Sequence, residues 1–150
     1  MGLYRVHHLK DGVDQSFFLK QRPRFDKSIA ESYCINKPQL LKVQDERNSK
    51  EVNPDKHMQK IAVSCKSHWE GNNYLHVADV KARDVVQALR NTNNINGHWF
   101  LTIAAGVEVI SNETGRNTGV GDIIEVVSTG ELLMVYGYTF INIHNGRLID

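Results

Sequence analysis

From Gly97 onward, short apolar runs alternate with glycine-containing turns, and this pattern predicts a series of β-strands. Asn145-Gly146 is the strongest turn signal, because both central residues of a tight hairpin turn need positive φ. The predicted strands in this region are Trp99–Ala105, Val107–Ser111, Asp122–Val127, Glu131–Tyr136, Tyr138–Ile143 and Arg147–Ile149.

The N-terminal residues follow a similar pattern and predict a β-hairpin. Leu3–Leu9 and Val13–Lys20 flank Asp11-Gly12, which is another favoured turn pair. Two further strands are predicted in the middle of the chain, at Ile61–Lys66 and Tyr74–Ala78.

One segment has helical spacing instead. Asp79 suits the N-cap position, and apolar residues follow it at i, i+3, i+4 and i+7, namely Ala82, Val85, Val86 and Leu89. This spacing predicts a helix over about residues 80–91.

Together these elements predict a mainly β domain, a sandwich or partly open barrel of about eight to ten strands with one clear helix packed on it. The alternative is an α+β fold, which requires Lys27–Ile35 and part of Lys42–Lys60 to be helical. Asp26 suits the N-cap of the first of these segments, but Tyr33-Cys34-Ile35 also suits a strand. No repeat or linker divides the chain, so we expect a single globular domain over residues 1–150.

The stretch from residue 42 to residue 60 is strongly polar and is predicted to be a loop insertion in that domain. Its only large apolar residues are Val43, Val52 and Met58, so burial cannot offset the entropy of ordering it. Pro54 argues against a long regular element there. If the loop is ordered, we expect a partner protein chain to hold it in place.

Length and composition are those of an ordinary globular protein. Of the 150 residues, 41% are hydrophobic and 23% are charged, which is enough for one core and argues against disorder. The chain has neither an apolar run of membrane-spanning length nor an apolar leader, so no membrane association is expected. Two cysteines, Cys34 and Cys65, are too few for a disulfide framework. We therefore expect a cytoplasmic location, or the host cytoplasm or virion for a viral protein.

The net charge of +1 is unevenly distributed. Residues 1–70 carry 13 Lys and Arg against 9 Asp and Glu, and residues 71–150 carry 5 against 8, so the two parts have charges of +4 and −3. This bias is too small for a dedicated nucleic-acid-binding protein.

One local pattern still suggests single-stranded nucleic acid, because basic residues beside aromatic rings can pair with phosphates and stack on bases. Its members are Phe17, Phe18, Lys20, Arg22 and Arg24. The alternative is that the phenylalanines belong to the core and the basic residues are solvated.

We find no sequence motif of nucleophilic or metal-dependent catalysis. An acid–base site could be formed by His76 or His98 with Asp122 or Glu125, because imidazole titrates near neutral pH and a carboxylate can fix its tautomer. Such combinations arise by chance in any chain of this length, so we favour a protein that is not an enzyme.

Neither a cofactor nor a metal ion is predicted. The glycine-rich residues 115–121 precede a predicted strand and not the helix that a phosphate-binding loop needs. Cys65 and His68 have half the spacing of a zinc site, but a second close pair is missing. His7 and His8 are neighbours in a predicted strand, so their side chains point to opposite faces and cannot share one ion. We expect one of them to be at the surface and the other half-buried.

Tyr136, Tyr138 and Phe140 alternate along a predicted strand whose other face is apolar as well. Such a strand is buried on both faces, either inside the domain or against another subunit. We therefore expect a non-enzymatic protein-interaction or assembly subunit, of the kind found among viral and phage structural or accessory proteins. Its expected partners are other protein chains, with a second copy among them. Single-stranded nucleic-acid binding is the second hypothesis, and a histidine-assisted hydrolase or transferase is the third.

Overall fold

The structure is a computed structural model of the 150-residue chain, and it describes residues 1–10, 54–94, 97–137 and 139–149. The predicted strand Val13–Lys20, the predicted helix Lys27–Ile35 and residues 42–53 of the predicted polar loop lie outside the described residues. So do all members of the predicted nucleic-acid site, which are Phe17, Phe18, Lys20, Arg22 and Arg24.

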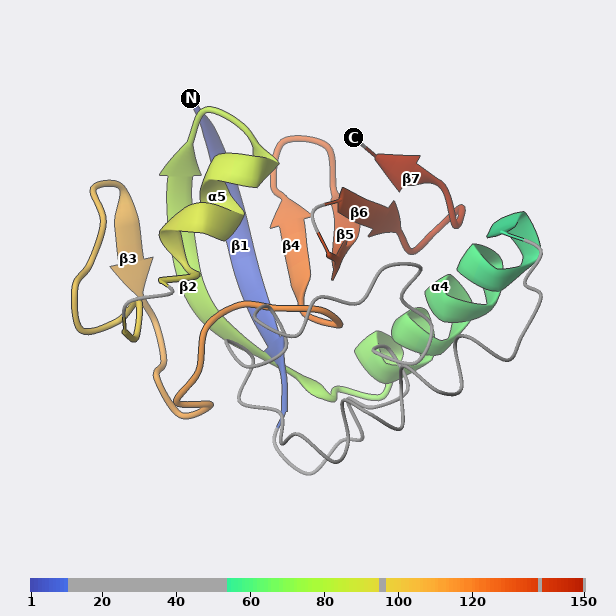
Figure 1. Ribbon diagram of the computed structural model, residues 1–150, viewed down its shortest axis with the longest axis horizontal. Helices are drawn as coiled ribbons and strands as arrows, with labels where there is room; N and C mark the ends of the chain where they lie inside the picture. Colours follow the sequence, from blue (N-terminus) through green and yellow to red (C-terminus); the bar gives the residue numbers. More distant parts are fainter. Residues whose placement is uncertain (11–53, 95–96, 138, 150) are drawn as a thin grey trace.

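Seven antiparallel strands form one open sheet in the described part of the chain, which confirms the predicted mainly β class (Figure 1). The order across the sheet is β3-β2-β1-β4-β5-β6-β7, so β3 and β7 are its edges and the N-terminal strand lies inside it. The strands are β1 (Gly2–Leu9), β2 (Tyr74–Ala82), β3 (Val107–Val109), β4 (Ile123–Val126), β5 (Glu131–Tyr136), β6 (Thr139–Asn142) and β7 (Leu148–Ile149).

Two helices, α4 (Pro54–Glu70) and α5 (Val85–Asn91), pack on opposite faces of this sheet (Figure 1). Side chains alternate between the two faces along each strand, and we call the two sides the α4 face and the α5 face. The α4 face buries Leu9, Ile123, Met134 and Ile141, and the α5 face buries Val6, Val80, Ile124 and Phe140. Neither described helix is long and apolar enough to cross a membrane.

Helix α4 corrects several predictions. Residues 54–60 of the predicted polar loop are helical, and the described part of the chain has this second helix besides the one predicted. The predicted strand Ile61–Lys66 is wrong, because these residues form the middle of the helix. Pro54 is the first helical residue, where its missing N–H costs no hydrogen bond, so it begins this element and does not prevent it. The helical period becomes visible only over a longer window, in the core contacts of Met58, Ile61, Ala62, Cys65 and Trp69.

The predicted helix over residues 80–91 begins too early. The chain continues in β2 as far as Ala82, with Val80 and Ala82 buried on the α5 face. The helix starts at Val85, and Asp84 is its N-cap, whose Oδ1 accepts a hydrogen bond from the backbone N–H of Gln87 at 2.8 Å. Asp79, the predicted cap, lies within β2 and pairs with β1.

The predicted strand Trp99–Ala105 is also wrong, because residues 99–106 form turns and irregular structure that lead into β3. Gly106 ends this segment with a φ of 83°, and its carbonyl accepts a hydrogen bond from the N–H of Lys81 at 2.9 Å. A Cβ atom at this position would lie 2.6 Å from the carbonyl oxygen of Lys81, so the contact requires glycine.

The remaining C-terminal strands lie close to their predicted positions, and β5 has the predicted bounds Glu131–Tyr136. The predicted pattern through Tyr136, Tyr138 and Phe140 is nevertheless divided between two strands. Gly137, with a φ of 72°, follows the end of β5, and Tyr136 and Phe140 are buried on opposite faces of the sheet. Tyr138 lies outside the described residues.

Candidate functional site

A β-bulge in β2 decides which side chains of this strand share the α4 face. Val6 pairs with Ala78 and His7 pairs with His76, so Val77 has no residue opposite it on β1. Val77 and Ala78 both pack on the α5 face as a result. The bulge therefore places His76 and Asp79, three residues apart, together on the α4 face.

The strand register then aligns polar side chains in two rows on the α4 face, beside the apolar cluster under α4. Cross-strand pairs in β3, β2, β1 and β4 align the charged residues Glu108, Asp79, Arg5 and Glu125. In the next row, His76 of β2 lies opposite His7 of β1. This face thus has a polar region, formed by side chains of β1 to β4, beside the apolar cluster that α4 covers.

His7 and His76 each meet a carboxylate there, and we call His7, His76, Asp79 and Glu125 the histidine–carboxylate cluster. His7 Nε2 lies 3.1 Å from Glu125 Oε1, and His76 Nε2 lies 2.7 Å from Asp79 Oδ1. The two imidazole ring centres are 5.2 Å apart, and the ring of Trp69 meets the ring of His7 edge to face at 4.8 Å. Within the described ranges, neither Nδ1 atom has a hydrogen-bond partner.

The environment of His7 favours its neutral form. Burial lowers the pKa of His7 below 6.5, and the hydrogen bond to Glu125 only partly opposes this effect. The nearby His76 and Arg5 lower this pKa further, as like charges do. A neutral His7 that contacts a carboxylate through Nε2 carries its proton on that nitrogen. The Nε2–H group donates a hydrogen bond to Glu125, and Nδ1 keeps its lone pair.

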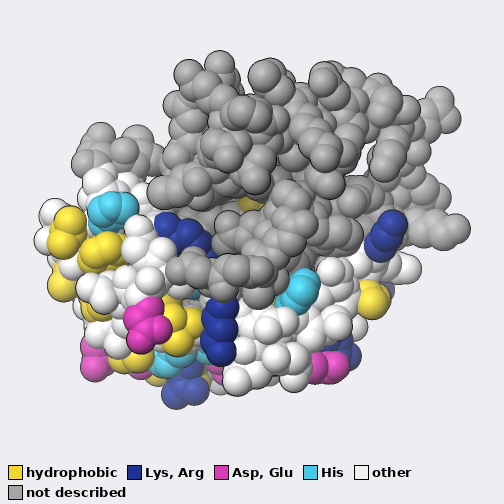
Figure 2. Space-filling view, turned by 90° about the horizontal axis from the view of Figure 1, so that it is seen from below, with side chains coloured by type: hydrophobic (Ala, Val, Ile, Leu, Met, Phe, Trp, Pro, Cys, Tyr) yellow, Lys and Arg dark blue, Asp and Glu magenta, His cyan; other side chains and the backbone are white. Residues whose placement is uncertain are grey.

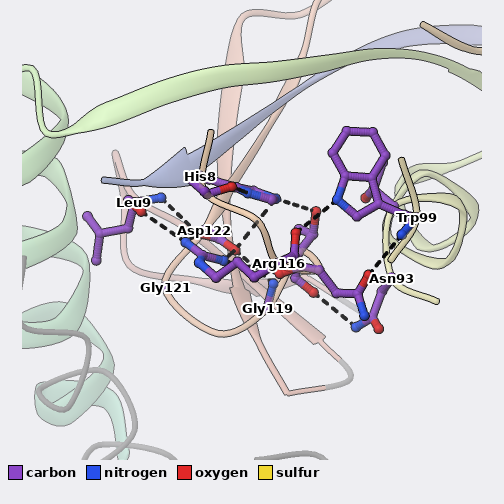
Figure 3. A network of polar contacts seen from close by, with 12 residues as sticks. His8, Leu9, Asn93, Trp99, Arg116, Gly119, Gly121 and Asp122 are labelled. Atoms are coloured by element: carbon purple, nitrogen blue, oxygen red, sulfur yellow. Dashed lines mark hydrogen bonds and ion pairs between the residues drawn. The ribbon is translucent and has the colours of Figure 1, made fainter. Parts of the chain in front are cut away.

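His8, the next residue of β1, points to the opposite face by the alternation of a strand, and its ring meets that of Trp99 at 6.2 Å. Figure 3 shows its polar surroundings. Its side chain is fully buried, with Nδ1 2.7 Å from Thr114 Oγ1 and Nε2 2.8 Å from Thr118 Oγ1. Two hydroxyl groups, each able to donate or accept, satisfy both nitrogens of a neutral ring. Burial is the main cause that lowers the pKa of His8 to about 4.

Beside His8, the carboxylate of Asp122 is fully buried and accepts four hydrogen bonds (Figure 3). Two come from the guanidinium of Arg116, one from the N–H of Leu9 at 2.8 Å and one from the N–H of Gly119 at 2.8 Å. Burial raises the pKa of Asp122, but the Arg116 and His8 charges and these hydrogen bonds outweigh it, so this pKa lies below its usual value. We call His8, Thr114, Thr118, Arg116 and Asp122 the buried polar network.

Hydrogen bonds of the buried polar network hold the loop between β3 and β4 against the rest of the domain. Arg116 Nη2 donates to the carbonyl of Leu9 at 2.9 Å, and the indole N–H of Trp99 donates to the carbonyl of Arg116 at 2.9 Å. Thr118 N donates to the carbonyl of Thr92 at 2.9 Å, which ties the same loop to the end of α5. His8, Thr118 and Asp122 have no exposed surface in this network, so its role is to hold the loop to the sheet.

The structure brings together some of the residues predicted for acid–base chemistry and separates others. His76 and Glu125 share the histidine–carboxylate cluster, where His7 lies between them. His98 is exposed and stacks on Phe100 at 5.2 Å, whereas Asp122 is fully buried with Arg116. Among the described residues no hydrogen bond or ion pair joins His98 to Asp122. The hydrolase or transferase hypothesis stays a prediction, restricted to His76 and Glu125.

Sequence reasoning missed His7 and Arg116. The prediction of one surface and one half-buried histidine differs from the structure, in which His7 is 9% exposed and His8 is not exposed. Their opposite orientation was visible in the alternation of a strand, but their partners are more than 100 residues away in the chain. No local spacing could have identified those partners.

Cys65 and His68, which have half the spacing of a zinc site, contact other side chains instead. Cys65 Sγ lies 3.2 Å from the hydroxyl of Tyr74, and His68 Nδ1 lies 3.1 Å from the side-chain nitrogen of Asn73. Burial raises the pKa of the Cys65 thiol to about 12, which disfavours the thiolate that a metal needs. No group of three or more His, Cys, Asp or Glu side chains in the described part of the chain is arranged to hold a metal ion.

Tyr136 and Phe140, predicted for a protein interface, are 3% and 0% exposed inside the domain. This burial agrees with the first of the two explanations for an apolar strand, and it leaves neither ring available on the surface.

Comparison of the chain with protein-family models, with curated proteins and with solved structures finds no match in any of the three. The function must therefore be argued from the surfaces of this molecule alone.

Proposed function

We propose that this domain is a non-enzymatic protein-interaction module, which binds another protein chain through the surface beside β3. The observation that carries the proposal is the exposure of large aliphatic side chains close together in the sequence. Leu101 is 73% exposed, Ile103 is 54% exposed and Ile110 is 47% exposed. In the space-filling view, hydrophobic side chains gather at the end of the molecule where Figure 1 places β3 (Figure 2). We call Leu101, Ile103 and Ile110 the β3 patch.

The β3 patch belongs to a segment that is anchored and yet does not bury these side chains. Trp99 is 1% exposed and donates its indole hydrogen bond to Arg116, while Val107 and Val109 pack on the α5 face. Leu101 and Ile103 thus lie between two buried anchors and Ile110 directly follows the second, yet all three side chains are exposed. Grouped aliphatic side chains that stay in water cost free energy, which binding to another protein recovers.

The charges near the β3 patch indicate the chemistry of the partner. Residues 97–115 contain two carboxylates, Glu108 and Glu113, and no Lys or Arg. Both carboxylates are exposed. A partner with an apolar surface flanked by Lys or Arg would complement this segment, whereas a second copy would bring like charges together. We therefore assign the β3 patch to a different protein chain, as expected for a subunit of a larger assembly.

The test is a pair of variants compared for binding and for oligomeric state. The Leu101→Asn, Ile103→Asn double variant removes most of the β3 patch, and Val63→Asn, at a site that is 69% exposed on α4, is the matched control. We expect a cross-linked partner from the native source to be lost with the double variant and retained with Val63→Asn. Higher salt should weaken the same complex, since its charges are complementary. A strictly monomeric protein without a partner, or a partner indifferent to the double variant, would contradict the proposal.

A further inference from the structure

The histidine–carboxylate cluster has a geometry that the interaction proposal does not use. Each imidazole directs Nε2 to a carboxylate, at 3.1 Å for His7 and 2.7 Å for His76. Histidines that bind metal ions in proteins almost always donate their other ring N–H to a carboxylate, a backbone carbonyl or water, and such a partner fixes the tautomer and raises the basicity of the ligand nitrogen. In both residues the nitrogen that remains for a ligand is Nδ1.

We propose that His7 and His76 together bind one divalent transition-metal ion of the zinc class through their Nδ1 atoms. Asp79 and Glu125 are positioning residues that hold the two Nε2–H groups. The two histidines come from directly opposed positions on β1 and β2, so the sheet itself sets their separation.

The separation of the two rings fits such an ion. With metal–nitrogen bonds of about 2.0–2.1 Å and a tetrahedral angle between them, two imidazole ring centres lie about 5 Å apart. The centres of His7 and His76 are 5.2 Å apart in the structure, with an angle of 35° between the ring planes. The separation of the two ring centres is therefore that expected for two imidazoles that share one ion.

Charge and access favour a cation at this position. The row of charged residues beside the two histidines contains the carboxylates of Glu108, Asp79 and Glu125 and the guanidinium of Arg5, a sum of −2. Lys81, two residues after Asp79 on the same face of β2, reduces that sum to −1. A negative surrounding attracts a divalent cation and repels phosphate, which argues against an anionic ligand.

Two protein ligands leave coordination positions open, in contrast to a structural zinc site, which takes four. The side chain of His76 is 33% exposed and that of His7 is 11% exposed, so water can complete the coordination from the solvent side. The expected affinity is accordingly modest.

The experiment is a titration of the untagged, chelator-treated full chain with Zn²⁺, followed by calorimetry and by long-range ¹H–¹⁵N NMR of the imidazole nitrogens. We expect one Zn²⁺ per chain and shifts of the Nδ1 signals of His7 and His76. This readout on the unaltered protein does not depend on any variant folding. The absence of binding, coordination through Nε2, or shifts confined to other histidines would overturn the proposal.

Three variants sharpen the result. His76→Asn should weaken Zn²⁺ binding about tenfold or more by removing a ligand, and Asp79→Asn should weaken it by about tenfold through the lost support of that ligand. His98→Asn, at an exposed histidine outside the cluster, is the matched control and should leave the affinity unchanged. Unchanged affinity in His76→Asn or in Asp79→Asn, or loss of binding in His98→Asn, would contradict the assignment.

Discussion

His7 and His8 are adjacent in the chain and serve opposite purposes. His8 lies between two threonine hydroxyl groups beside a fully buried ion pair, where it can only hold the loop between β3 and β4 to the sheet. His7 lies on the α4 face, where its Nε2 contacts a carboxylate and its Nδ1 has no hydrogen-bond partner among the described residues. The residue type is the same, so the face of β1 decides whether an imidazole supports the fold or is available to a ligand.

The buried polar network around His8 and the histidine–carboxylate cluster around His7 should differ most in how much they contribute to the free energy of unfolding. Asp122→Asn removes the buried negative charge that accepts two hydrogen bonds from the guanidinium of Arg116 and directs an amide N–H at groups that donate, so it should lower the free energy of unfolding by about 3–5 kcal/mol. Glu125→Gln, in the partly exposed histidine–carboxylate cluster, should cost less than about 1 kcal/mol. Urea denaturation of both variants checks this contrast. Equal losses would show that the two regions do not differ in the way described.

The second prediction concerns pH. The pKa of His8 is lowered from 6.5 to about 4 in the folded protein, so the unfolded chain binds a proton between these values that the folded chain does not. Stability should therefore fall as the pH drops from about 6.5 to about 4, by on the order of 3 kcal/mol for this one group. His7 adds to the slope in the same direction, since its pKa is lowered as well.

Denaturation at a series of pH values, with the wild type and His8→Gln compared, isolates the part due to His8. The variant is expected to be less stable at pH 7 and to lose less stability on acidification. A variant with the same pH slope as the wild type would contradict the role given to His8.

The smallest effects are expected at His7, where two neighbouring charges act in opposite directions. Arg5→Gln removes a cation that lowers the pKa of His7, so this pKa should rise. Glu125→Gln removes a hydrogen bond and a negative charge that raise the pKa, so it should fall further. NMR titration of the imidazole protons measures both shifts, and shifts of the same sign in the two variants would refute the arrangement of this cluster.

The sequence allowed the C-terminal hairpins to be predicted well, because their signals are local. Asn145-Gly146 lies in the turn before β7, although only Gly146 has the expected positive φ, and Glu131–Tyr136 has the predicted bounds of β5. Residues 61–66 were assigned to a strand because a short apolar run does not distinguish a strand from a buried helix segment. The helix start was misplaced for a similar reason: Asp79 and Asp84 both precede apolar residues, and only the pairing of β2 with β1 selects the second.

The histidine–carboxylate cluster and the buried polar network could be predicted from the sequence less well than the fold. The pairing of His7 with His76 depends on a bulge at Val77, and a shift of one residue in this register would direct His76 to the other face. The partners of His8 and Asp122 come from a loop whose glycines predict a turn but not its hydrogen bonds. Long-range register and loop conformation are tertiary properties, so residue spacing carried no signal for them.

The central claim is that β1 separates a closed structural network from a histidine open to a ligand, and one measurement tests it most directly. The nitrogen signals of both imidazoles are followed by ¹H–¹⁵N NMR from pH 8 to the acid limit of the folded protein, with chelator present. The account predicts that His8 stays neutral until about pH 4 and is unaffected by Zn²⁺ when the chelator is removed, while His7 shifts on Zn²⁺ addition. Titration of His8 near pH 6.5, or a response of His8 and not His7 to Zn²⁺, would contradict it.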